Sequence, residues 1–74
     1  MVQPADRPTS RAMLAVIKDA GAKGTAYRRM DGTWSVRLWQ LPSLPASEQA
    51  EWLAVMTDRL EAAAGVRPEV ETED

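Results

Sequence analysis

The stretch that decides the fold is residues 24–40, GTAYRRMDGTWSVRLWQ. Two runs that contain Tyr, Trp, Val and Thr, residues that favour strands, flank the pair Asp31-Gly32. An Asp-Gly pair between two such runs is typical of a two-residue type I′ turn, so the stretch predicts a β-hairpin. The two prolines of residues 41–45 end the second strand, because proline has no amide hydrogen to donate to a sheet.

A two-residue turn fixes the register of the hairpin and therefore its two faces. In this register Arg29 pairs with Trp34, and Tyr27 pairs with Val36. We expect the inner face to pack on helices and the outer face to meet solvent or a partner. The inner face then consists of Tyr27, Trp34, Val36 and Leu38, and the outer face of Arg28, Met30, Ser35, Arg37 and Trp39.

A first helix is predicted over roughly residues 10–20. Thr9 or Ser10 can cap its start, and Gly21 stands where a helix-ending glycine belongs. Gly21 and Gly24 also match the GxxG spacing of a nucleic-acid clamp, but a helix end followed by a turn explains both glycines. The apolar residues that recur at helical spacing are Met13, Leu14, Ile17 and Ala20.

A second helix is predicted from Ala46 or Ser47 to Ala64. Ser47 is a suitable cap, and Gly65 is the stop signal. The apolar face of this helix consists of Trp52, Leu53, Met56, Leu60, Ala63 and Ala64.

These elements predict a small α+β domain with the order helix, strand, strand, helix and both helices on one face of the hairpin. Residues 9–65 would form this domain. Residues 1–8 contain two prolines and no apolar periodicity, which predicts a disordered arm. Residues 66–74 contain four acids and no apolar pattern, which predicts a disordered, mobile acidic tail.

The composition argues against most catalytic chemistry. The 74-residue chain has no histidine and no cysteine, so it lacks the commonest general base, the commonest metal ligands and a thiolate nucleophile. The four serines, Ser10, Ser35, Ser43 and Ser47, have no histidine to activate them. We therefore expect no enzyme, no cofactor and no metal site.

The longest apolar run, residues 12–17, is far shorter than the roughly 20 residues that cross a bilayer. The first residues show no basic segment followed by an apolar stretch, the pattern of an export signal. A cytoplasmic location, without membrane association, is the expectation.

Charge is distributed unevenly along the chain. Residues 7–40 carry seven Lys and Arg against two acids, which gives +5. Residues 41–74 carry eight acids against two Arg, which gives −6. Such polarity can serve a bipartite binder, a head-to-tail contact or solubility alone.

Tryptophan and arginine indicate a binding surface. Trp39 is predicted to face outward beside Arg37, and Trp, Tyr and Arg are over-represented at binding hot spots. The alternative is a register shift near Gly24 that would turn Trp39 under the first helix. Val55 is predicted to point outward beside Trp52. The expected partner-binding residues are Arg28, Arg37, Trp39, Trp52 and Val55.

The sequence therefore predicts a small, non-enzymatic interaction protein whose macromolecular partner is a protein. Accessory proteins and inhibitors, including those of phages and mobile elements, belong to this class. The alternative is a nucleic-acid-binding ribbon, in which arginines contact phosphates and an indole stacks on bases. The residues of this alternative are Lys23, Arg28, Arg29, Arg37 and Trp39, and the isoelectric point near 5.0 counts against it.

A homodimer is also expected. A two-stranded sheet is marginal on its own, and the apolar arc of the first helix is too wide for one hairpin to cover. Two hairpins that meet edge to edge would form a four-stranded sheet.

Overall fold

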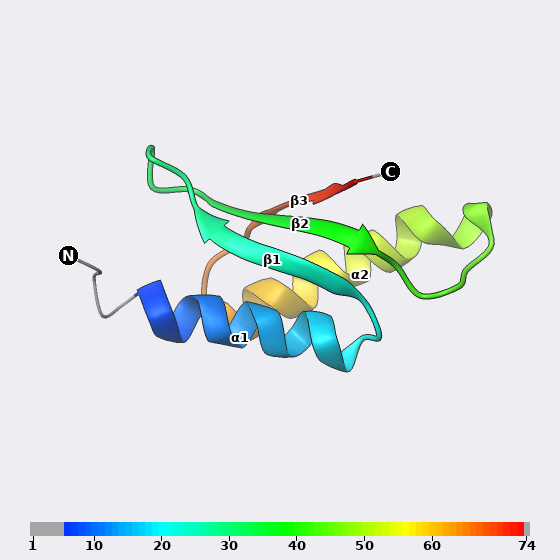
Figure 1. Cartoon of the computed structure of the whole chain (residues 1–74), viewed down its shortest axis with the longest axis horizontal. Coiled ribbons are helices and arrows are strands. Elements are labelled where there is room, and N and C mark those ends of the chain that lie inside the picture. Colours follow the sequence, from blue (N-terminus) through cyan, green and yellow to red (C-terminus); the bar gives the residue numbers. More distant parts are fainter. Residues whose placement is uncertain (1–5, 74) are drawn as a thin grey trace.

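The computed structural model describes residues 6–73. The elements follow in the order α1 (Asp6–Asp19), β1 (Lys23–Arg28), β2 (Trp34–Gln40), α2 (Ala46–Ala64) and β3 (Glu69–Thr72). The strands form one sheet in the order β1-β2-β3, in which β1 is antiparallel and β3 is parallel to β2. Both helices lie on the same side of this sheet (Figure 1). The α+β class and the helix, strand, strand, helix order are confirmed, and β3 is an addition to them.

The core lies between the helices and the sheet. Alternate residues of a strand share a face, so the burial of Trp34, Val36 and Leu38 identifies the face of β2 that meets the helices. Trp34 is thus a core residue, as predicted. The helices contribute Met13 and Ile17 from α1 and Met56 and Leu60 from α2.

Both helices end at the predicted glycines. Gly21 has φ 77°, a left-handed conformation that favours glycine, and its N–H donates to the Lys18 carbonyl. The Ala22 N–H donates to the Ile17 carbonyl, which completes a Schellman motif. Gly65 ends α2 with φ 79°.

The starts of the helices differ from the expectation. α1 begins at Asp6, so the prediction of a disordered arm is wrong for residues 6–8, which belong to the helix. Residues 1–5 lie outside the described part. Pro8 does not prevent this, because the first amides of a helix have no acceptor within it. α2 begins after Pro45 and has no side-chain cap, so the prediction of Ser47 as a cap is wrong.

The hairpin is present, but its predicted register is wrong by one residue. Ala26 pairs with Val36, and Tyr27 pairs with Ser35. The shift moves β1 side chains to the opposite face of the sheet. Tyr27, predicted to face the helices, lies on the outer face and is 37 % exposed. Arg28, predicted to lie on the outer face, pairs with Trp34 and so belongs to the helix side.

The turn explains the shift. The Gly32 N–H donates to the Arg29 carbonyl at 3.0 Å, and Gly32 has φ 90°. A type I′ turn also needs a positive φ at Asp31, and within residues 6–73 only glycines have one. The turn is therefore a three-residue connection in which Gly32 forms a bulge. The Asp31 carboxylate accepts hydrogen bonds from the Thr33 hydroxyl and amide, which lower the pKa of Asp31.

The prediction of a disordered acidic tail is wrong for residues 69–72, which form β3. Val70 pairs with Val36 and packs against the core. Beyond the strand, the Glu73 N–H donates to the Leu38 carbonyl at 2.7 Å. The strand is stabilised by this pairing and by charges on its outer face.

β3 also changes the expected assembly. It occupies the second edge of β2, so two copies joined through their β1 strands would form a six-stranded sheet rather than the expected four-stranded one. The homodimer itself stays a prediction. Within the described chain, neither helix combines the length and apolarity needed to cross a bilayer.

Candidate functional site

The sheet face opposite the helices carries a cluster of charges. Arg29 lies 3.2 Å from a carboxylate oxygen of Glu69 and 3.2 Å from one of Glu71. Arg37 lies 3.9 Å from the other carboxylate oxygen of Glu71. The charge of Glu69 is the main cause that raises the pKa of Arg29. Two arginines expected to contact phosphate therefore face carboxylates of the same chain.

Ser35 lies beneath this cluster and is fully buried. Its hydroxyl accepts a hydrogen bond from Arg29 at 3.2 Å and donates one to the Glu69 carbonyl at 3.4 Å. Both hydrogen bonds are structural, since they connect β3 and the hairpin turn to β2. The contacts of Ser35 do not include a general base that could activate it.

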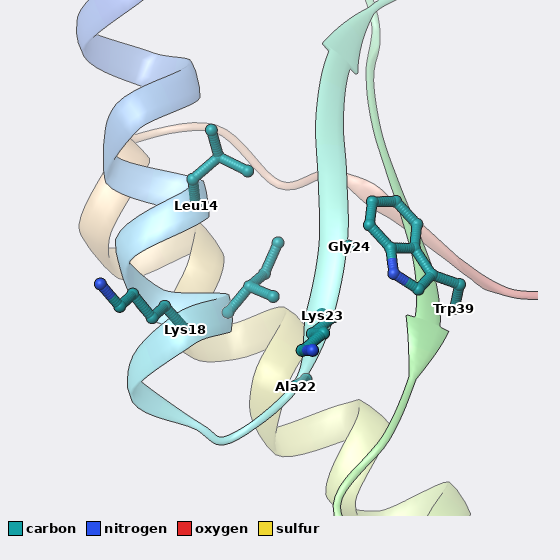
Figure 2. Close-up of a pocket in the computed structure, with 7 residues that line it drawn as sticks. Leu14, Lys18, Ala22, Lys23, Gly24 and Trp39 are labelled. Atoms are coloured by element: carbon teal, nitrogen blue, oxygen red, sulfur yellow. The ribbon is translucent and has the colours of Figure 1, made fainter.

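A bulge in β2 determines where Trp39 lies. Gly24 pairs with Leu38 and Lys23 pairs with Gln40, so Trp39 is the extra residue of β2 at this point. Bulges redirect side chains. The indole lies beside β1 near Gly24 and is 52 % exposed (Figure 2). The register shift near Gly24 is thus present, and Trp39 is exposed nevertheless.

Gly24 is required for this arrangement. A Cβ atom at Gly24 would lie 2.5 Å from the Arg37 carbonyl oxygen and 2.6 Å from Cδ2 of Leu38. Both distances are shorter than van der Waals contacts allow. The absence of a side chain therefore lets β1 approach β2 closely at the bulge.

Trp39 borders a shallow groove of about 290 Å³. Leu14, which is 40 % exposed, extends from α1 toward β1, while the indole of Trp39 lies on the other side of the β1 ribbon (Figure 2). Lys18 and Lys23 add positive charge, and neither forms an ion pair with the described residues. We call this site the Trp39 groove; its residues are Leu14, Ile17, Lys18, Ala22, Lys23, Gly24 and Trp39.

A second hollow lies at the start of α2. Val55, which is 51 % exposed, and Trp52 give it an apolar floor. Glu48 and Glu51 make its border negative, in contrast to the positive border of the Trp39 groove. We call it the Trp52 patch; its residues are Leu44, Glu48, Glu51, Trp52 and Val55.

The expected partner-binding residues do not form one surface. Trp39 lines the groove, whereas Trp52 and Val55 belong to the patch on α2. Arg37 belongs to the charged cluster of the outer sheet face, and Arg28 lies on the helix side at the far end of β1. Of the nucleic-acid set, only Lys23 and Trp39 line a common groove.

The sequence did not identify Leu14 and Lys18 as residues that line the groove. Leu14 follows the same helical spacing as the buried Met13 and Ile17, so the pattern alone placed it in the core. The useful signal was the excessive width of the apolar arc on this helix, which left part of it uncovered.

Comparisons with models of protein families, with curated proteins and with solved structures find no match to this chain. Within residues 6–73, acidic side chains do not gather in a group of three or more that could hold a metal ion.

Proposed function

We propose that this chain is a non-enzymatic protein-binding module whose site is the Trp39 groove. The observation that supports it most is the half-exposed indole of Trp39, which a bulge directs toward the edge of β1. A tryptophan buries up to roughly 250 Å², so covering the exposed half would contribute about 3 kcal/mol to binding. This contribution suits a hot spot.

The chemistry of the groove favours an acidic protein segment with an apolar anchor. Leu14 and Trp39 provide apolar walls for the anchor. Lys18 and Lys23 provide charges that attract carboxylates, and the described residues offer no ion-pair partner for them. A module that holds such a segment suits an accessory or inhibitory role toward the partner protein.

The nucleic-acid alternative has less support. A phosphate that approached Arg29 or Arg37 would have to displace Glu69 or Glu71. Duplex binders concentrate positive charge on one face, whereas this sheet face carries both signs. Only two of the residues that line the groove are basic, Lys18 and Lys23.

The test is a titration of the isotope-labelled chain with a short synthetic peptide in which glutamates alternate with valines around a central leucine. We expect the indole N–H signal of Trp39 and the amide signals of Lys23 and Gly24 to shift. Trp39→Ala should weaken binding, followed through the two amides, by about 30-fold, which corresponds to a hot-spot loss of about 2 kcal/mol.

Met30→Ala is the matched control, because Met30 is a fully exposed apolar residue at the hairpin turn, outside the groove. It should leave the affinity unchanged. The same peptide with lysines in place of glutamates should bind far more weakly. Equal binding of the acidic and basic peptides, or equal affinity of Trp39→Ala and the parent chain, would contradict the proposal.

A further inference from the structure

We propose that the partner segment binds as an added β-strand along the free edge of β1, and that this segment is acidic and extended. The inference rests on the proposed function, because it places the partner in the Trp39 groove. It adds the backbone geometry of the complex and the conformation of the bound segment.

β1 is the edge strand of the sheet, so half of its backbone groups have no partner strand. The Arg29 N–H donates to the Thr33 carbonyl, which fixes which β1 residues point toward β2. Hydrogen-bonded pairs alternate along an antiparallel ladder. The N–H and C=O groups of Gly24 and Ala26 therefore point away from β2, and an incoming strand can pair with them.

The Trp39 groove crosses this edge. Figure 2 shows Leu14 on the helix side of β1 and Trp39 on the opposite side, with Gly24 between them. Side chains of an added strand would alternate between these two sides. One apolar side chain would then meet Leu14, and the next would meet Trp39, while the backbone pairs with β1.

β3 of the same chain shows which kind of strand pairs with this sheet. β3 is an acidic strand, Glu69–Thr72, and it pairs with β2 while its glutamates contact Arg29 and Arg37. The edge of β1 is also positive, since Lys23 and Arg28 are its terminal residues. An acidic strand therefore suits the β1 edge as β3 suits β2.

A second copy of the chain fits this edge less well. Two β1 strands can pair antiparallel only with their outward-pointing residues opposite one another. The register centred on Ala26 places Lys23 opposite Arg29 twice, and like charges opposite one another destabilise a sheet. The other edge strand, β3, has only four residues, and short charged edges resist pairing. These features favour a segment of another protein as the occupant.

The experiment measures amide hydrogen exchange of the whole chain with the acidic peptide described above. At a peptide concentration about ten times Kd, the Gly24 and Ala26 amides should exchange about 10-fold more slowly. The Thr25 and Tyr27 amides already face β2 and serve as internal controls with little change. A peptide N-methylated at alternate amides, which cannot pair along one edge, should lose this protection and bind about 10-fold more weakly.

The outcomes separate this inference from the proposed function. If the peptide shifts the Trp39 indole signal but does not slow exchange at Gly24 and Ala26, the strand geometry is wrong and the module stands. If no signal shifts, both fail. If exchange slows without peptide as the protein concentration rises, the occupant is a second copy, and the inference of an acidic partner segment is overturned.

Discussion

Gly24 allows β1 to approach β2 closely at the bulge, where Trp39 is left without a paired residue. A Cβ atom there would meet the Arg37 carbonyl oxygen at 2.5 Å, and that oxygen belongs to a strand paired on both sides. We expect Gly24→Ala to lower the free energy of unfolding by about 1–3 kcal/mol, the usual cost of overpacking. It should also shift the indole N–H signal of Trp39. Chemical denaturation and NMR measure the two effects.

Gly21→Ala separates this steric effect from backbone strain. Gly21 has φ 77°, and a Cβ atom there would have nothing within 4 Å. Its cost should be about 1–2 kcal/mol from the left-handed backbone alone, with little change of the Trp39 signal. If Gly24→Ala unfolded with the same free energy as the parent chain and kept its Trp39 signal, the close approach of β1 and β2 would not control the groove.

Residues also differ in how far the sequence determines their place. Gly21 and Gly65 could be predicted as helix ends, because the left-handed conformation is a local property. Asp31-Gly32 was ambiguous, since it suits a two-residue turn and equally a longer turn in which only Gly32 has a positive φ. One residue of turn length then decided the face on which Tyr27 and Arg28 lie.

Among the elements, β3 shows what a pattern of single residues cannot predict. Its four residues include one apolar side chain, Val70, so no periodicity could mark it as a strand. The usable signal was the charge difference between the two halves of the chain. Glu69 and Glu71 contact Arg29 and Arg37, and their alternate spacing places both carboxylates on one face.

The charges on β3 give a prediction for this element. Arg29→Glu would place a carboxylate beside Glu69 and Glu71, and like charges on one sheet face repel. We expect β3 to separate from β2 more often, so the Glu73 amide, which donates to the Leu38 carbonyl, should exchange severalfold faster. High salt should reduce the difference, because it screens exposed charges.

Two variants support the interpretation of this exchange experiment. Adding Glu69→Arg to Arg29→Glu restores an opposite pair and should restore part of the Glu73 protection. Arg59→Glu breaks a more exposed ion pair between the helices, with Asp19, and should leave the Glu73 amide unchanged. Equal exchange in Arg29→Glu and the parent chain would mean that backbone pairing alone holds β3.

At the scale of the whole molecule, part of the charge polarity of the sequence is neutralised within the fold. Arg29 and Arg37 of the basic half contact Glu69 and Glu71 of the acidic half. The charges around the two hollows differ in sign: lysines border the Trp39 groove and glutamates border the Trp52 patch. The formal charge of −2 therefore says little about either site, whereas the local distribution favours an acidic partner for the groove.

This distribution predicts how the molecule responds to nucleic acid. Random-sequence duplex and single-stranded DNA should leave the Trp39 indole and the Arg29 and Arg37 side-chain NMR signals unchanged, even at low salt, where phosphate binding is strongest. Removing the carboxylates with Glu69→Gln and Glu71→Gln should release both arginines and produce weak, salt-sensitive shifts. Shifts in the parent chain that report a duplex binding constant falling by about 0.9 log unit per log unit of salt for each contacted phosphate would instead favour the nucleic-acid alternative. The variant with both glutamines keeps the β3 backbone. Signal shifts with DNA that occur in this variant but not in the parent chain would show that the carboxylates of β3 mask the arginines from phosphate.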